Sequence, residues 1–208
     1  MKVTIIGTGT MARALATLAL ATGHHVTFVG THVSKALDLV DEFEGEGEVR
    51  AAEEVDGDLV VLAVPFTQAP HAVRQHAAEL DGKVLVDVTN PVDLGALEPL
   101  DVAPFRSGAE LISAAAPPAA PVVKAFNTAF AGTLMAREVA GRRLDVFVAA
   151  DDADAKAKVV GLAEQAGLRP IDAGELARAR ELEALGYLHM VVQPALGTAF
   201  GSAVAVLP

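Results

Sequence analysis

Lys2–Arg13 reads KVTIIGTGTMAR, and this stretch decides the fold that the sequence predicts. Its apolar run ends at Gly7-Thr8-Gly9, after which apolar residues recur at helical spacing. A dinucleotide pyrophosphate needs backbone N–H groups at close range, and side chains at both glycines would obstruct it. Ala12, at the third position of Gly-x-Gly-x-x-Gly/Ala, is small enough for the helix to lie close to the strand. We interpret the stretch as a nucleotide-binding turn, with an ordinary glycine turn of an α/β protein as the alternative.

The rest of the chain alternates expected strands and helices. Apolar runs predict strands over residues 25–29, 58–65, 83–88, 122–128, 143–149 and 169–171, and helical patterns fall over 68–80, 109–115 and 153–166, with a long helix from about Glu175. This alternation is typical of an α/β fold of the Rossmann type, doubly wound, with a mostly parallel sheet and here a short helical C-terminal extension.

We expect one dinucleotide-binding domain over residues 1–208. Its Rossmann core would span 1–150, and a C-terminal strand and helices over 151–208 would close the cofactor cleft. The acid-rich segment 38–58 is expected to be a solvated helix and loop at the sheet edge. We expect the apolar tail from Tyr187 to pack under the sheet edge or in a subunit interface.

Composition excludes several classes of function. The net charge of −11 argues against nucleic-acid binding, which depends on basic contacts to phosphate. Cysteine is absent, which removes thiol catalysis and disulfides and fits a cytoplasmic protein. The six histidines do not have the spacing of a zinc site. The sequence contains no Gly-x-Ser-x-Gly motif of a nucleophilic serine. The C-terminal tail is mostly apolar, but its polar residues and glycines make it a poor membrane span. We therefore expect no metal, no membrane and no nucleophilic catalyst.

The residues after the second expected strand indicate which nucleotide binds. Enzymes that prefer NAD usually place Asp or Glu about 20 residues past the first glycine, to bind the ribose 2′-hydroxyl. This chain has Gly30-Thr31-His32-Val33-Ser34-Lys35 there. Hydroxyl, imidazole and ammonium groups can surround a 2′-phosphate, whereas a carboxylate would repel it. The sequence favours NADP, unless Ser34 merely caps the next helix and Lys35 is a solvated surface charge.

Five motifs together resemble the coenzyme F420-dependent NADP oxidoreductase family. They are Gly7-Thr8-Gly9-Thr10-Met11-Ala12, Gly30-Thr31, Ala63-Val64-Pro65, Val123-Lys124-Ala125-Phe126-Asn127-Thr128 and Arg169-Pro170-Ile171-Asp172-Ala173-Gly174. The similarity spans essentially the whole chain, and the last two motifs are much more restricted than the glycine turn. The resemblance implies hydride exchange between NADP(H) and a deazaflavin, F420, stacked on the nicotinamide. No catalytic residue is expected, because hydride moves directly between the cofactor rings.

The resemblance also implies roles for individual residues. It implies that the pyrophosphate would be bound by Thr8, Gly9, Thr10 and Met11. The 2′-phosphate would be bound by Thr31, His32 and Lys35. The nicotinamide ribose would be bordered by Val64, Pro65 and Asn90. The side of the cleft that holds the deazaflavin would be shaped by Phe126, Asn127 and Thr128 together with Asp172, Ala173 and Gly174. Gly7 and Ser34, taken from the local pattern alone, complete the expected cofactor-binding set.

One residue departs from the family pattern, and alternative functions stay open. His32 stands where the family commonly has Arg, so bidentate phosphate binding is lost and the preference for NADP should be weaker or dependent on pH. Reductases of carbon substrates append a helical domain of roughly 100 residues, and only Asp172–Pro208 follows the last expected strand. The alternatives are a flavin or ferric reductase that uses FMN or chelated iron, and a non-catalytic NADP sensor. We expect a homodimer whose partners are small redox cofactors.

Overall fold

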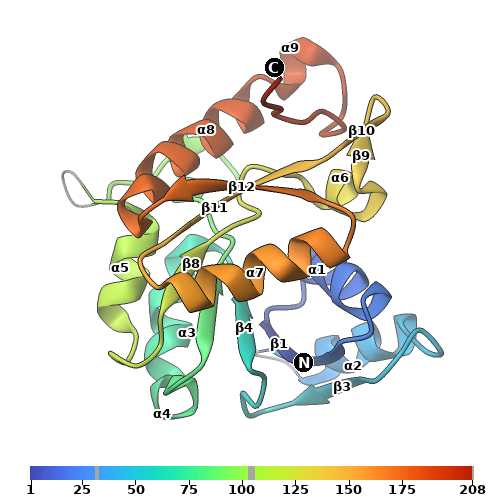
Figure 1. Cartoon of the computed structure of the whole chain (residues 1–208), viewed down its shortest axis with the longest axis vertical. Coiled ribbons are helices and arrows are strands. Elements are labelled where there is room, and N and C mark those ends of the chain that lie inside the picture. The colour runs from blue at the N-terminus through green and yellow to red at the C-terminus, as the bar shows by residue number, and fades with distance from the viewer. Residues whose placement is uncertain (31–32, 103–105, 208) are drawn as a thin grey trace.

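The structure, a computed structural model, describes residues 1–30, 33–102 and 106–207. Within these residues, eight strands form one sheet in the order β12-β11-β8-β5-β4-β1-β2-β3 (Figure 1). They are β1 (Lys2–Ile6), β2 (His25–Val29), β3 (Val49–Ala52), β4 (Leu59–Leu62), β5 (Val84–Asp87), β8 (Val122–Lys124), β11 (Asp145–Ala150) and β12 (Arg169–Gly174). All neighbours are parallel except β8 and β11, which are antiparallel. The mostly parallel, doubly wound α/β fold is confirmed.

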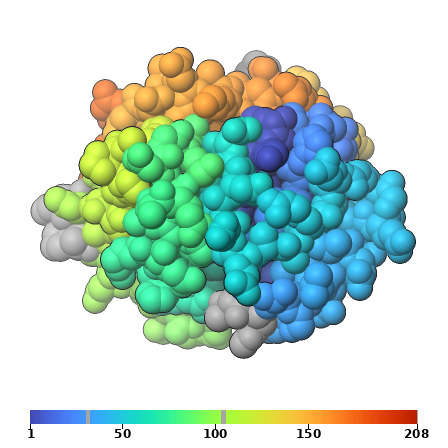
Figure 2. Space-filling view, turned by 90° about the horizontal axis from the view of Figure 1, so that it is seen from below, coloured from blue at the N-terminus to red at the C-terminus, as the bar shows by residue number. Residues whose placement is uncertain are grey.

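Helices cover both faces of the sheet. One face carries α1 (Thr10–Ala21), α2 (Val33–Glu42), α6 (Ala131–Ala136) and α7 (Ala153–Gln165); the other carries α3 (Ala69–Gln75), α4 (Ala77–Leu80), α5 (Gly108–Ala115) and the start of α8 (Ala179–Val191). Figure 2 shows the same division, with α7 in orange along one side of the molecule and α3 and α4 in green on the other. Helix α9 (Gln193–Leu196) follows α8 at the end of the chain.

The central strands are apolar throughout because side chains on both of their faces are buried. In β4 all four residues, LVVL, are buried. Neighbouring residues of β1 divide between the two faces: Ile5 packs into the core under α1 and α7, and Ile6 packs into the core under α3 and α5. In the described part of the chain, no helix is long and apolar enough to cross a bilayer.

The sheet differs from the expected one at its two ends. Residues 49–52 form the edge strand β3 inside the acid-rich segment, where only helix and loop were expected. Its side chains are at most half-buried, so the strand lacks the apolar run that marks a central strand. At the other end β11 reverses direction, which an apolar run does not encode. Two short hairpins, β6 (Val92–Asp93) with β7 (Glu98–Pro99) and β9 (Glu138–Val139) with β10 (Arg142–Arg143), were also not predicted.

A buried carboxylate ties the C-terminal segment to β11 and β12. The guanidinium of Arg169 donates to both oxygens of Asp145 at 2.5 and 2.6 Å, and the backbone N–H of Val206 donates to the same carboxylate at 2.8 Å. Burial alone would raise the pKa of Asp145, but the hydrogen bonds from Arg169 and Val206, together with the positive charge of Arg169, hold that pKa below its ordinary value. The group is therefore ionised in the folded protein at neutral pH.

We expect Asp145→Asn to lower the free energy of unfolding by about 1–2 kcal/mol at pH 7, toward the low end for charged hydrogen bonds because Arg169 is partly exposed. The folded pKa lies below the unfolded one, so this stabilisation is present above the unfolded pKa of ~3.9 and is lost as pH falls through the folded pKa. Denaturant titrations of the variant and the wild type at pH 7 and below pH 4 measure the difference in their free energies of unfolding. Asp38→Asn, on an exposed side chain, is the control, and an equal deficit for Asp145→Asn at both pH values would contradict the assignment.

Candidate functional site

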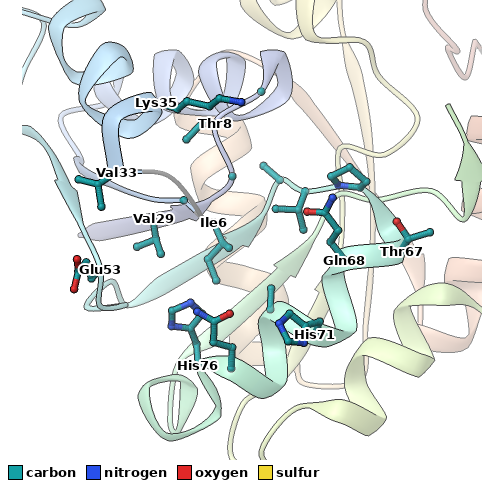
Figure 3. Close-up of a pocket in the computed structure, with 18 residues that line it drawn as sticks. Ile6, Thr8, Val29, Val33, Lys35, Glu53, Thr67, Gln68, His71 and His76 are labelled. Atoms are coloured by element: carbon teal, nitrogen blue, oxygen red, sulfur yellow. The ribbon is translucent and has the colours of Figure 1, made fainter. Parts of the chain in front are cut away.

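A cleft of about 1040 Å³ opens where β1, β2 and β4 end (Figure 3). Its lining comprises Ile6, Gly7, Thr8, Gly9, Val29, Gly30, Val33, Lys35, Glu53, Ala63, Val64, Pro65, Thr67, Gln68, His71, Ala72, Gln75 and His76. The residues come from the ends of β1, β2 and β4, from α2, from the residue after β3, and from α3 with the residues on either side of it. Six of the expected site residues are among them: Gly7, Thr8, Gly9, Lys35, Val64 and Pro65. The cleft lies at the carboxyl edge of the parallel strands, where open α/β sheets bind their ligands.

The two glycines of the turn have different roles. Gly7 has φ +125°, and a Cβ there would lie 2.3 Å from the carbonyl oxygen of Ala63, so the fold itself requires glycine. At Gly9 a Cβ would meet no atom within 4 Å, so the protein alone leaves room for a side chain. Gly9 is also the N-cap of α1, and no side chain caps the helix there. The N-terminal N–H groups of α1 are thus available to an anion.

The wall of the cleft beyond Val29 carries a basic group, Lys35. This lysine lies in the first turn of α2 and, like Thr8, lines the cleft (Figure 3). Thr31 and His32, expected at the same place, lie outside the described residues. Ser34 is exposed and is not part of the lining. Arg13 is unavailable, because its guanidinium donates to both oxygens of Glu42 at 2.6 and 2.7 Å.

Sequence reasoning missed the floor of the cleft, which α3 provides. Gln68, just before α3, and His71 and Gln75 within it recur at spacings of three and four and line the cleft, so polar residues at helical spacing after a central strand were the available signal. Below them His76 is buried, with Nδ1 3.2 Å from a carboxylate oxygen of Glu79. Together with Glu53, which also lines the cleft, these side chains make the floor polar.

Two strand-end loops meet at the other side of the glycine turn. The amide of Asn127 donates to Oδ1 of Asn90 and to the carbonyl of Leu182 on α8, both at 2.9 Å, and Asn90 donates to the carbonyl of Asn127 at 2.8 Å. The carbonyl of Thr128 accepts a hydrogen bond at 2.9 Å from Nδ1 of His189 on α8. The structure therefore brings the expected residues Asn90, Asn127 and Thr128 together beneath α8.

A buried lysine organises the same region and was not expected to have a role. Lys124 on β8 is fully buried and donates to Asp87 at 2.8 Å, to the carbonyl of Thr89 at 2.5 Å and to Glu183 on α8 at 2.9 Å. Three acceptors use all three ammonium protons. Glu183 also accepts from the first two backbone N–H groups of α5, at 2.8 and 3.1 Å. The network joins β5, β8, α5 and α8 at the carboxyl edge of the sheet.

The remaining expected residues lie away from the cleft lining. Thr10 and Met11 are at the start of α1, and Met11 packs against the core. Phe126 is buried and has φ +63°. Asp172 lies on β12, whose order in the sheet places it two strands beyond β8, and its carboxylate accepts from Lys156 at 2.7 Å. The hydrogen bonds from Lys156 and from the N–H of Gly174 hold the pKa of Asp172 below its ordinary value.

Ala173 lies at the irregularity where β11 and β12 shift register. Gly174 has φ +98°, and its carbonyl also accepts from Lys156 at 2.7 Å. Among the described residues, no group of three or more His, Asp and Glu side chains is arranged to hold a metal ion.

Comparison with known proteins supports a specific family. The sequence model of the family "NADP oxidoreductase coenzyme F420-dependent" matches residues 2–91. The structure of a candidate F420-dependent NADP reductase from Arthrobacter sp. FB24 is 31% identical and superposes with a TM-score of 0.85, over 99% of this chain and 100% of that one. The chain belongs to the F420-dependent NADP oxidoreductase family. It is an NADP-dependent oxidoreductase by that membership.

Two further relatives of this chain have named activities. The F420-dependent NADP reductase of Methanocaldococcus jannaschii is 28% identical in an alignment of 202 positions that covers 89% of each chain. The metalloreductase STEAP3 of Rattus norvegicus is 35% identical over 185 residues, which are 88% of this chain but 36% of the rat protein. The chain thus spans about a third of that relative. None of these relatives supports FMN as the electron acceptor.

We expect Gly9→Val to abolish NADPH binding while the protein stays folded, because the side chain enters open space over the turn and blocks the approach of pyrophosphate. Gly7→Val is the matched comparison. Its side chain meets the backbone of Ala63, so this variant should lose stability as well as binding. Circular dichroism and nucleotide titration separate the two effects. A folded Gly9→Val that binds NADPH as the wild type does would place the cofactor elsewhere.

We expect the wild type to bind NADPH more tightly than NADH and Lys35→Ala to weaken NADPH binding by roughly tenfold to a hundredfold, the worth of one charged hydrogen bond. NADH binding should hardly change, since it lacks the 2′-phosphate. Lys158→Ala, an exposed lysine on α7, controls for the loss of one positive charge. Dissociation constants from nicotinamide fluorescence measure both. An equal loss of affinity for NADPH and NADH in Lys35→Ala would show that Lys35 does not contact the 2′-phosphate.

Proposed function

We propose that the protein transfers a hydride between NADP(H) and a deazaflavin, coenzyme F420, stacked on the nicotinamide. The observation that carries the proposal is the cleft around an uncapped helix N-terminus, with open space over Gly9 and a lysine on its wall. Its volume lies at the upper end of the range of small-molecule sites, as a dinucleotide requires. Relatives that cover nearly the whole chain are F420-dependent NADP reductases, which favours the deazaflavin.

The residues of the cleft fit NADP(H) in one direction. Gly9 and the N-terminus of α1 would bind the pyrophosphate. Lys35 on the β2 side would bind the 2′-phosphate, so the adenosine would lie toward β2 and α3. The nicotinamide must then extend past Val64 and Pro65 toward the ends of β5 and β8. Thr31 and His32, outside the described residues, remain proposed contacts to the 2′-phosphate.

In the proposed reaction the protein positions the two rings and excludes water from them. NADPH, when bound, supplies the hydride. Val64 and Pro65 provide an apolar border at one strand end, and the loop after β8 with α8 closes the opposite side. Holding two rings in contact makes the transfer effectively unimolecular. Because the hydride would move directly between ring carbons, that transfer needs no acid or base, and the proton that completes the reduction of the deazaflavin would come from solvent. Residues 151–208, which include α7, β12 and α8, are proposed to complete this side of the cleft.

A metalloreductase is the second candidate, because STEAP3 has the highest sequence identity among the relatives described above. In that reading the same NADPH site would deliver electrons to chelated iron. We further propose a cytoplasmic homodimer, consistent with the absence of cysteine. Exposed apolar side chains on α8, α9 and the C-terminal segment support the dimer; they are Leu188, Leu196, Phe200, Val206 and Leu207.

Stopped-flow mixing of the enzyme and NADPH with coenzyme F420, FMN and ferric chelate, in separate runs, distinguishes these candidates through the nicotinamide absorbance. We expect fast oxidation of NADPH with F420 and slow oxidation with the other two acceptors. Gly9→Val, which should not bind NADPH, gives the uncatalysed background. Fast oxidation only with ferric chelate would replace the proposal by the metalloreductase, and no oxidation with any of the three acceptors would contradict both proposals.

A further inference from the structure

Three neighbouring strands end at the same level of the sheet edge. The last residues of β1, β2 and β3 are paired in register. The residues that follow them are Gly7, Gly30 and Glu53, and all three line the cleft. Because adjacent strands lie about 4.8 Å apart, Glu53 stands roughly 10 Å from the glycine turn, on the far side of β2.

Glu53 brings a negative charge into a cleft whose other features suit an anion. Among the described residues that line the cleft, it is the one carboxylate. Its side chain has no hydrogen bond or ion pair within the described part of the chain, although Asp56 in the same loop is paired with Arg50. A carboxylate can only accept hydrogen bonds and repels phosphate. Its partner in the cleft must therefore be a donor that carries no negative charge.

The surroundings of Glu53 suit a flat ring. Val33, at the start of α2, is 42% exposed and turns apolar surface to the cleft, and Val29 adds to that surface. Figure 3 shows Glu53, Val33 and Val29 at one end of the cleft and Thr67 at the other. Binding sites for small molecules typically combine apolar walls with a few placed polar groups that fix orientation. An apolar wall with one acceptor at its edge fits a planar base that carries an amine.

We propose that Glu53 recognises the adenine base of NADP(H), with its carboxylate accepting a hydrogen bond from the exocyclic 6-amino group. The placement rests on the proposed function. With the pyrophosphate at the end of β1 and the 2′-phosphate at Lys35 beyond β2, the base is the part of the nucleotide that reaches toward β3. The amino group is the donor of adenine, whereas its ring nitrogen N7 accepts. The carboxylate therefore selects adenine over bases that carry oxygen or hydrogen at this position.

Base-modified cofactors test this hydrogen bond. Dissociation constants are measured for NADP⁺, for its purine analogue, in which hydrogen replaces the 6-amino group, and for its hypoxanthine analogue, in which oxygen replaces it. The proteins are the wild type, Glu53→Gln and Glu54→Gln. Glu54 is a matched control, because it is the next exposed acid in the sequence and lines a hollow beside β3 but not the cleft. The readout is the ratio between ligands within one protein, because removing a negative charge changes the affinity for all three anionic ligands.

We expect the wild type to bind the purine analogue roughly threefold to tenfold more weakly than NADP⁺, the worth of one hydrogen bond. The hypoxanthine analogue should bind at least as weakly, because its oxygen would face the carboxylate. In Glu53→Gln the ratio for hypoxanthine should fall to about one, since an amide can donate to the oxygen as well as accept from the amine. Glu54→Gln should keep the ratios of the wild type.

Equal binding of NADP⁺ and the purine analogue by the wild type would overturn the proposal, whether or not the variants fold. Wild-type ratios in a Glu53→Gln protein that is folded by circular dichroism would also overturn it, because another group would then read the base. The titrations use no electron acceptor. A failure of F420 to oxidise NADPH would thus leave the role of Glu53 standing, whereas a protein that does not bind NADP⁺ would contradict both this role and the proposed function.

Discussion

The close approach of the backbone at Gly7 to the end of β4 is the contact on which the site depends. No side chain fits between Gly7 and the carbonyl of Ala63, so the turn after β1 and the end of β4 are held in contact. This contact sets Val64 and Pro65 beside the glycine turn and directs the N-terminus of α1 into the cleft. The contact between these two strand ends therefore shapes the cleft, and Gly9 leaves open space above it.

The other half of the edge is organised by charge. Lys124 is fully buried, and its ammonium is balanced by Asp87 and Glu183, while Glu183 also binds the start of α5. Removing one partner from a buried ion pair typically costs about 3–5 kcal/mol, because the other charge is left without compensation. The network therefore makes the positions of β5, β8, α5 and α8 mutually dependent. Asn90 and Asn127 are positioned by this arrangement and by the approach of α8 at Gly186.

The sequence predicts most of the fold because central strands and amphipathic helices leave periodic apolar patterns. β4, buried on both faces, could be recognised from LVVL alone, whereas β3 could not, because an edge strand needs no apolar run. Strand direction is not written in periodicity, so the reversal at β11 was missed. In the site, the glycine turn follows from local chemistry. The role of Lys124 does not, since its partners lie 37 and 59 residues away in the sequence.

We propose direct hydride transfer between two rings held at the ends of β4, β5 and β8 as the reaction of this protein. Its most direct test uses NADPH deuterated at C4, in each of the two stereochemical positions, with F420 in ordinary water. Mass spectrometry of the reduced deazaflavin then reports the source of the transferred hydrogen. We expect full retention of deuterium from one stereoisomer and none from the other. Hydrogen taken from solvent, or equal transfer from both stereoisomers, would contradict a site that positions the two rings.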